Sequence, residues 1–384
     1  MKSVFKKAFA VVLAAAMLVT LAACGGGNTA NNTEYVIGVS GPLTGPAAVY
    51  GVAVQNSAQM AIDEINAAGG LDGVKFKLEA MDDKHDATKV AANFAALMEK
   101  GMQVSLGTVT TAPGLEFTKL SNDDKVFFLT PSASGDKIPE FDNGFQMCFA
   151  DGNQGAVAAK FVNGLGLSKI GIFYKSDDPY SKGIFDQFKA NLDKGIETVD
   201  TVFTAANETD FSAQITELKD CDFIFMPIYY QPASVFMTQA KGVLKDNATY
   251  YGCDGFDGLA GQIDLATIPQ EVSMLSHFDA TSSAQATVDF VKKYTDKYGA
   301  ETLNQFGASA YDCVYAIYGA MKEMKAAGKD IPVTISAEEL YGLLKAHFTG
   351  DFSFSGVTGE NITWEDSGYV NKAAVKFTLK EADK

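Results

Sequence analysis

Pairs of hydroxyl side chains follow two consecutive predicted strands of this chain. Thr110 and Thr111 follow one strand, and Ser132 and Ser134 follow the next. Hydroxyl groups and the backbone N–H groups at a helix start can hold a carboxylate. Arginine, whose planar fork matches a carboxylate, is missing, because all 31 basic residues are lysines. The sequence therefore leaves hydroxyls, backbone N–H groups, helix N-termini and lysine for binding an anion, although the same residues also suit helix capping and a turn after Pro131.

The predicted elements explain how these hydroxyls come together. From residue 34 onward, short apolar strand patterns alternate with helix patterns. The strand patterns cover residues 35–40, 74–81, 103–107, 126–130, 145–149, 169–174, 198–203, 222–228, 249–253 and 272–277. Such alternation is typical of parallel sheets covered by helices, which bind ligands at the loops that leave the C-terminal strand ends.

Two successive runs of this alternation indicate two α/β lobes. The chain is longer than one ordinary domain of about 100–200 residues. Breaks near residues 149–153 and 277–281 indicate that the chain crosses between the lobes more than once, which suits a hinge. The expected first lobe combines residues 34–149 with about 279–346. The expected second lobe combines about 150–278 with 347–384.

The start of the chain reads as an export signal. Three lysines within the first seven residues precede an apolar run over 8–19, and the sequence Leu-Ala-Ala-Cys ends at Cys24. The ending resembles a bacterial lipobox, whose cysteine is acylated. We therefore expect a leader over 1–23, lipid attachment at Cys24, a flexible tether over 24–33 and an extracytoplasmic protein anchored to the cell membrane. The alternative is an ordinary signal peptide with an incidental cysteine.

Composition excludes several classes of function. The formal net charge of −16 disfavours nucleic acid and anionic lipid as partners. Cys148, Cys221, Cys253 and Cys313 show neither a CxxC pair nor a metal spacing, so we expect buried free thiols and no metal. The glycines after the first strand are not spaced as GxGxxG, and a GxSxG elbow is missing. We therefore expect neither a cofactor nor an enzyme.

Several segments together resemble the leucine/isoleucine/valine-binding protein family. They read SGPLTGPAAVYG, AIDEINAAGG, LDGVKFKLEAMDDKHDATKVAANFAALMEKG, TTAPG and FLTPSASG. The likeness covers nearly the whole chain after residue 35 and is most specific over 41–68 and 82–99. It implies the type I periplasmic binding fold, in which two Rossmann-like lobes joined by three crossovers close on an amino acid. It also implies a monomeric solute-binding component of an ABC importer, with the permease transmembrane subunits as partners.

The resemblance also implies a ligand site. Thr111 takes the place of the family's carboxylate-binding hydroxyl residue. Ser132 and Ser134 take the places of a carbonyl and a hydroxyl that hold the ammonium and the carboxylate. Tyr229 falls on a carboxylate-binding tyrosine, and Asp254 falls on the acid that pairs with the ammonium. From position alone, Tyr229 is also compatible with the core, with Tyr230 as the contact, and Asp254 with a turn.

Two further tyrosines and two departures complete the comparison with the family. Tyr50 and Tyr180 match aromatic positions that wall the pocket. Asp254 is one methylene shorter than the glutamate of the best-known members. His85 and Thr110 lie where some members have the cysteines of a first-lobe disulfide. The expected ligand is a small amino acid-like solute, with branched-chain aliphatic amino acids as the first candidates. The alternatives are a ligand-sensing receptor module without a transport role and an exported hydrolase.

Overall fold

A five-stranded parallel sheet organises the first lobe. The computed structural model describes residues 32–381, and within that range the sheet has the strand order β2-β1-β3-β4-β5. Its strands are β1 (Tyr35–Gly41), β2 (Phe76–Asp82), β3 (Val104–Ser105), β4 (Phe128–Thr130) and β5 (Gly144–Gln146). Because parallel neighbours cannot be joined by tight hairpins, longer crossovers connect them, and most of these crossovers contain a helix.

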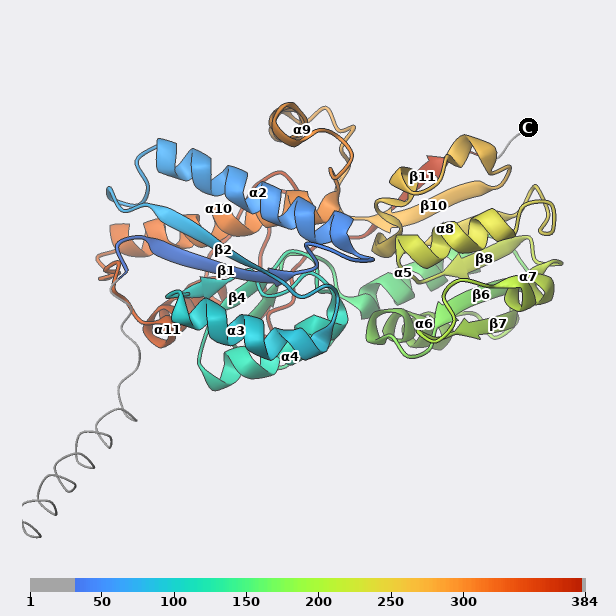
Figure 1. The fold of residues 1–384 in the computed structure, drawn as a ribbon, viewed down its shortest axis with the longest axis horizontal. Helices are drawn as coiled ribbons and strands as arrows, with labels where there is room; N and C mark the ends of the chain where they lie inside the picture. Colours follow the sequence, from blue (N-terminus) through green and yellow to red (C-terminus); the bar gives the residue numbers. More distant parts are fainter. Residues whose placement is uncertain (1–31, 382–384) are drawn as a thin grey trace, which may run out of the picture.

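Alternate residues of these strands face two different helical layers. Phe127 packs against Phe348 with ring centroids 5.1 Å apart, whereas the adjacent Phe128 packs against Phe117 on the other face. One layer consists of α2 (Ala48–Ala67), α10 (Gln305–Ala326) and α11 (Ala337–Phe348), and the other of α3 (Val90–Glu99) and α4 (Thr111–Asp123) (Figure 1). Helix α9 (Gln285–Tyr298) joins this lobe through an ion pair between Lys297 and Asp63 of 2.8 Å.

The second lobe repeats this plan with a six-stranded sheet, counted within the described residues. The strand order is β11-β10-β9-β8-β6-β7, and β11 alone runs antiparallel to its neighbour. The strands are β6 (Lys169–Lys175), β7 (Glu197–Phe203), β8 (Phe223–Met226), β9 (Thr249–Gly252), β10 (Glu271–Ser276) and β11 (Val375–Lys380). Helices α5 (Asp151–Asn163) and α6 (Pro179–Asn191) cover one face, and α7 (Ser212–Leu218) and α8 (Tyr230–Gln239) cover the other. Within residues 32–381 there are four short 3-10 helices: η1 (Ala87–Lys89), η2 (Asp254–Phe256), η3 (Leu259–Gly261) and η4 (Leu265–Thr267).

The C-terminal segment does not follow the expected lobe boundary at residue 347. The Trp364 indole Nε1 donates to the Gln146 carbonyl of the first lobe, 2.7 Å away, and its ring stacks with Phe352. This segment covers apolar rings of the first lobe that would otherwise face water. The assignment of residues 347–384 to the second lobe is therefore wrong for the stretch through Val370, and β11 is the part that joins the second sheet.

Some sequence expectations fall outside the described part of the chain. The leader over 1–23, Cys24 and the tether up to residue 31 belong to this group. Within residues 32–381, none of the helices has the length and apolar character needed to span a bilayer. The four cysteines of this range are buried free thiols.

Candidate functional site

The C-terminal strand ends of the two sheets face each other and form an interlobe crevice of about 200 Å³, counting the space that is open to solvent. All seven ligand-site residues expected from the sequence line it. From the first lobe come Tyr50, Thr111, Ser132 and Ser134, and from the second come Tyr180, Tyr229 and Asp254. Each of them follows a parallel strand or starts the next helix, which is where open α/β sheets gather ligand-binding groups. The structure therefore brings together residues up to 204 positions apart as one surface.

The N-terminus of α4 presents a free donor to the crevice. Thr111 is 2% exposed, and its hydroxyl has no hydrogen-bond partner among residues 32–381. Neither hydroxyl caps the helix, because Thr110 at the N-cap makes no side-chain cap within this range and instead pairs with His85 Nδ1 at 2.9 Å. A buried polar atom without a partner costs free energy. The unpartnered hydroxyl and the uncapped N–H groups of α4 are therefore ready to bind an anionic group.

The two serines after β4 play different structural parts. The Ser132 hydroxyl donates to the Val109 carbonyl at 2.6 Å and so ties the loop after β4 to the loop after β3. The turn interpretation therefore holds for this hydroxyl, and the Ser132 carbonyl is the group left for a ligand. Ser134 is buried, and its carbonyl accepts from the Asp151 N–H at 2.8 Å.

Asp254 sits in a fixed network on the opposite lobe. It is 1% exposed, and the Tyr180 hydroxyl donates to its Oδ1 at 2.7 Å. The Gly255 N–H donates to the same tyrosine oxygen at 2.9 Å, and the Asp254 N–H donates to Gln154 Oε1 at 3.0 Å. Burial raises the pKa of Asp254 to about 6, and the hydrogen bond from Tyr180 opposes that rise. Tyr180 therefore positions the acid as well as walling the crevice.

A second buried acid, which the sequence patterns did not single out, lies directly behind Ser134. Asp151 begins α5 and is 1% exposed, and its Oδ2 has no hydrogen-bond partner in the described part of the chain. Burial and then the charge of Asp254 raise the pKa of Asp151 well above its ordinary value. An acid at the start of a helix normally indicates a solvated first turn, which is why sequence reasoning missed it. The sequence feature that could have indicated its burial is the apolar segment over 147–150, which immediately precedes Asp151.

Aromatic rings close the crevice between the lobes. The Tyr229 ring stacks on Tyr180, with centroids 4.5 Å apart and planes 13° from parallel, and meets the edge of the His85 ring of the first lobe. The Tyr50 hydroxyl donates across the lobe boundary to the Gly255 carbonyl at 2.6 Å. Tyr230 packs edge-on against the Tyr50 ring. Of these two neighbouring tyrosines, Tyr229 is therefore the one that lines the crevice.

The electrostatics of the crevice combine positive helix ends with buried carboxyl groups. Helices α4 and α8 start at it from opposite lobes, and neither start has a side-chain cap from the described residues. Each exposes the positive end of a helix dipole. Asp254 supplies an acceptor for a cation. Within residues 32–381, no cluster of acids, histidines and cysteines is suited to a metal ion. The arrangement therefore matches a small molecule that carries one negative and one positive group.

Comparison with known proteins agrees with this geometry. Residues 34–373 match the family model described as periplasmic binding protein. The chain is 29% identical over 324 residues to the Leu/Ile/Val-binding protein BraC3 of Rhizobium johnstonii, covering 79% of this chain and 86% of that protein. It is 28% identical over 288 residues to the leucine-, isoleucine-, valine-, threonine- and alanine-binding protein of Pseudomonas aeruginosa, covering 71% of this chain and 75% of that protein.

A solved structure agrees as well. The branched-chain amino acid transporter substrate-binding protein LivJ from Streptococcus pneumoniae, in complex with isoleucine, superposes with a TM-score of 0.78 at 27% identity. The superposition covers 91% of this chain and 96% of that one. The resemblance to the leucine/isoleucine/valine-binding proteins is thus confirmed, and so is the type I fold with two α/β lobes. The chain belongs to the periplasmic binding protein family, whose members are extracytoplasmic solute-binding proteins of ABC importers.

Proposed function

We propose that this protein captures a free α-amino acid between its lobes and delivers it to the transmembrane subunits of an ABC permease. The observation that carries the proposal is the pairing, across one crevice, of the unpartnered Thr111 hydroxyl with the buried acid Asp254. The Thr111 hydroxyl can donate a hydrogen bond to an anionic group, and the Asp254 carboxylate can accept one from a cationic group. An α-amino acid carries both groups on one carbon.

The carboxylate is bound without arginine. Thr111, Ser134 and the N–H groups at the start of α4 approach it from the first lobe, and Tyr229 approaches from the second. Each hydrogen bond to a charged group contributes about 1.5–3 kcal/mol. Four or five such bonds, less the costs of ordering and desolvation, are compatible with a micromolar dissociation constant, about −8 kcal/mol.

The ammonium is bound by Asp254, together with the Ser132 carbonyl. Asp151 adds a second negative charge behind Ser134 when it is ionised. A bound cation stabilises the ionised form of both acids, which burial alone disfavours. Because the carboxylate contacts come mainly from one lobe and Asp254 comes from the other, the ligand connects the lobes. Closure is therefore favoured by the extra contacts that the ligand makes in the closed state.

Branched-chain aliphatic amino acids are the first candidates for the ligand, because BraC3 is a Leu/Ile/Val-binding protein and LivJ was solved in complex with isoleucine. We further propose that the protein is a monomer held at the membrane by a lipid on Cys24. No observation favours the sensing alternative.

Three matched ligands test the proposal. Leucine, isocaproate (leucine without its ammonium) and isoamylamine (leucine without its carboxylate) are titrated by calorimetry and thermal unfolding. Leucine at 100 times its dissociation constant should stabilise the protein by about 2.7 kcal/mol, while both analogues should bind far more weakly. Equal binding of leucine and isocaproate would contradict an ammonium site. Mass spectrometry of the recovered ligand should show it unchanged.

A further inference from the structure

A second interlobe pocket adjoins the crevice. It encloses about 430 Å³, counting its open mouth, and Tyr229 lines both cavities. His85 also lines it and is hydrogen-bonded to Thr110, which lines the crevice. We call this space the outer pocket. The Tyr229 ring and the His85–Thr110 pair therefore form the boundary between the crevice and the outer pocket.

The outer pocket has apolar walls and a polar end. Ala47 of the first lobe and Phe203 and Ile228 of the second are buried apolar wall residues. At the polar end, the Lys175 ammonium pairs with Glu208 at 2.5 Å, and its side chain is only 17% exposed. Of the described residues that line the two cavities, Lys175 is the only lysine.

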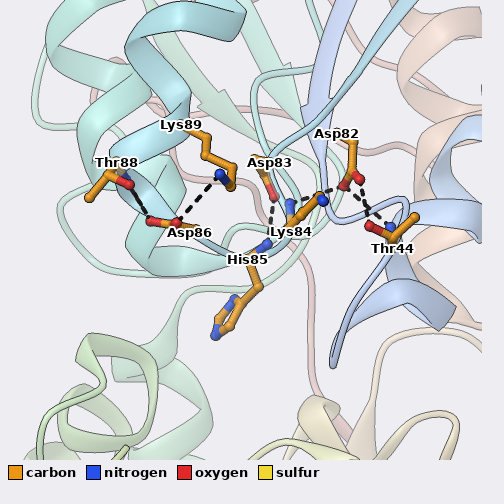
Figure 2. A network of polar contacts seen from close by, with 8 residues as sticks. All are labelled: Thr44, Asp82, Asp83, Lys84, His85, Asp86, Thr88 and Lys89. Carbon is orange, nitrogen blue, oxygen red and sulfur yellow. Dashed lines mark hydrogen bonds and ion pairs between the residues drawn. The ribbon is translucent and has the colours of Figure 1, made fainter.

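Two further polar groups face this end. Asp178 is 5% exposed, and its Oδ2 accepts from the Ser181 N–H at the start of α6. Figure 2 shows the His85 ring extending out of its loop toward the second lobe. Nδ1 of this ring is used by Thr110, so Nε2 is the ring's remaining polar atom. The polar end therefore combines a cation, two acids and an imidazole.

The backbone holds His85 in place. Lys84 and His85 both have left-handed backbone angles, with φ of 57° and 64°. The His85 N–H donates to Asp83 Oδ1 at 2.9 Å, and the Lys84 N–H donates to Asp82 Oδ1 at 3.0 Å. Residues other than glycine adopt such angles only where surrounding contacts determine them, and they cluster at ligand-binding positions. The ring is therefore a fixed part of the pocket and is not a mobile surface side chain.

We propose that the outer pocket receives the side chain of the bound amino acid and that, beyond branched-chain side chains, it also binds side chains that end in a carboxamide, such as that of glutamine. The inference rests on the proposed amino acid site. A carboxamide offers both a carbonyl and an N–H₂ group, which match Lys175 on one side and Asp178 or Glu208 on the other. The polar end sets two acids against one lysine, which disfavours a side-chain carboxylate. The leucine side chain fills only the apolar walls, so the polar end stays without a ligand contact.

Calorimetry with glutamine, leucine and norleucine tests the proposal. Norleucine matches the length of glutamine and lacks its polar end. Wild-type protein should bind both leucine and glutamine, and glutamine about tenfold more tightly than norleucine. Lys175→Met should weaken glutamine binding about tenfold and leave leucine binding within twofold, which also shows that the variant is folded. Lys241→Met, an exposed lysine that pairs with Thr267 away from both pockets, is the matched control and should change neither affinity.

The outcomes separate this inference from the proposed function. Wild-type protein that binds leucine but not glutamine would overturn the side-chain assignment and leave the amino acid site standing. An equal loss of leucine and glutamine affinity in Lys175→Met would also overturn it, because the lysine would then act through lobe closure. Protein that binds none of the three amino acids would refute the proposed function, and the inference would fail with it.

Discussion

Replacement of Asp254 by asparagine separates the charge of this residue from its shape. The side chain is buried and accepts from the Tyr180 hydroxyl, an interaction that the amide oxygen of asparagine can keep. Removing one partner of a buried charge pair costs about 2–5 kcal/mol. At 1.4 kcal/mol per tenfold change, the dissociation constant for leucine should rise by about 30- to 4,000-fold. Asp151 remains behind Ser134 as a second acid, so we expect the lower part of this range.

The pH dependence provides a second test of the same residue. Burial raises the pKa of Asp254 to about 6, and the ligand ammonium needs the ionised acid. Affinity should therefore fall as the pH decreases through 6, with an increase in the dissociation constant of about tenfold between pH 7 and pH 5. The Asp254→Asn variant should show a weaker pH dependence, because Asp151 is then the acid that remains to titrate beside the ligand. Calorimetry at pH 5, 6 and 7 measures both curves.

The empty variant should also be more stable than the empty wild type. An acid whose folded pKa is raised from 3.8 to about 6 opposes folding once it ionises, by about 3 kcal/mol at pH 7 and by almost nothing below pH 4. Thermal unfolding without ligand should therefore show a stability gain in Asp254→Asn at pH 7 that disappears toward pH 4. A variant that binds leucine more weakly but unfolds at a higher temperature has lost the binding site and has kept its fold.

The matched control is Asp257→Asn. Burial also raises the pKa of Asp257 to about 6, but its carboxylate accepts from the Gln305 N–H at the start of α10 and does not line the crevice. Its leucine affinity should stay within about threefold of wild type. The assignment of Asp254 would be refuted by unchanged affinity in Asp254→Asn, by a pH-independent wild type, or by an equal loss in both variants.

Three further substitutions test separate contacts. Thr111→Val should weaken leucine binding, measured by calorimetry, about 10- to 100-fold. It should not destabilise the empty protein, because the Thr111 hydroxyl has no partner within residues 32–381. A fall in the thermal stability of the empty variant would contradict this assignment. Tyr50→Phe removes the bond to the Gly255 carbonyl and should cost about 1 kcal/mol of closed-state stability, seen as roughly fivefold weaker binding; unchanged affinity would exclude a role in closure. Tyr180→Phe removes a hydrogen bond that lowers the pKa of Asp254, so the midpoint of the binding pH profile should move above 6; a midpoint that stays or falls would argue against the network.

The sequence was sufficient for the fold class and for the group of crevice residues. Strand and helix patterns give the order of elements, and parallel sheets put their loops at one edge, so Thr111 and Ser134 necessarily meet there. Strand ends were less predictable. The assigned strand β3 covers only Val104–Ser105 of the expected 103–107, although the Leu106 N–H still donates to the Gly38 carbonyl and the Ser40 N–H to the Gly107 carbonyl.

Three features could not be predicted because they depend on tertiary packing. Asp151 looks like an ordinary helix start, but it is buried in the folded protein. His85 and Thr110 replace a cysteine pair with a hydrogen bond of 2.9 Å, which no spacing rule indicates. The segment around Trp364 covers the first lobe through an indole contact to Gln146, which no sequence pattern indicates.

The discontinuous first lobe has a consequence for how the chain folds. The Tyr35 hydroxyl in β1 donates to the Ile331 carbonyl, 296 positions later, and α2 is packed against α10. The lobe therefore cannot be completed until most of the polypeptide has been synthesised. Contacts of such long range slow folding, because long loops must close before their interactions form. A chain that is slow to complete its first lobe stays unfolded for longer. This suits an extracytoplasmic protein, which must cross a membrane before it folds.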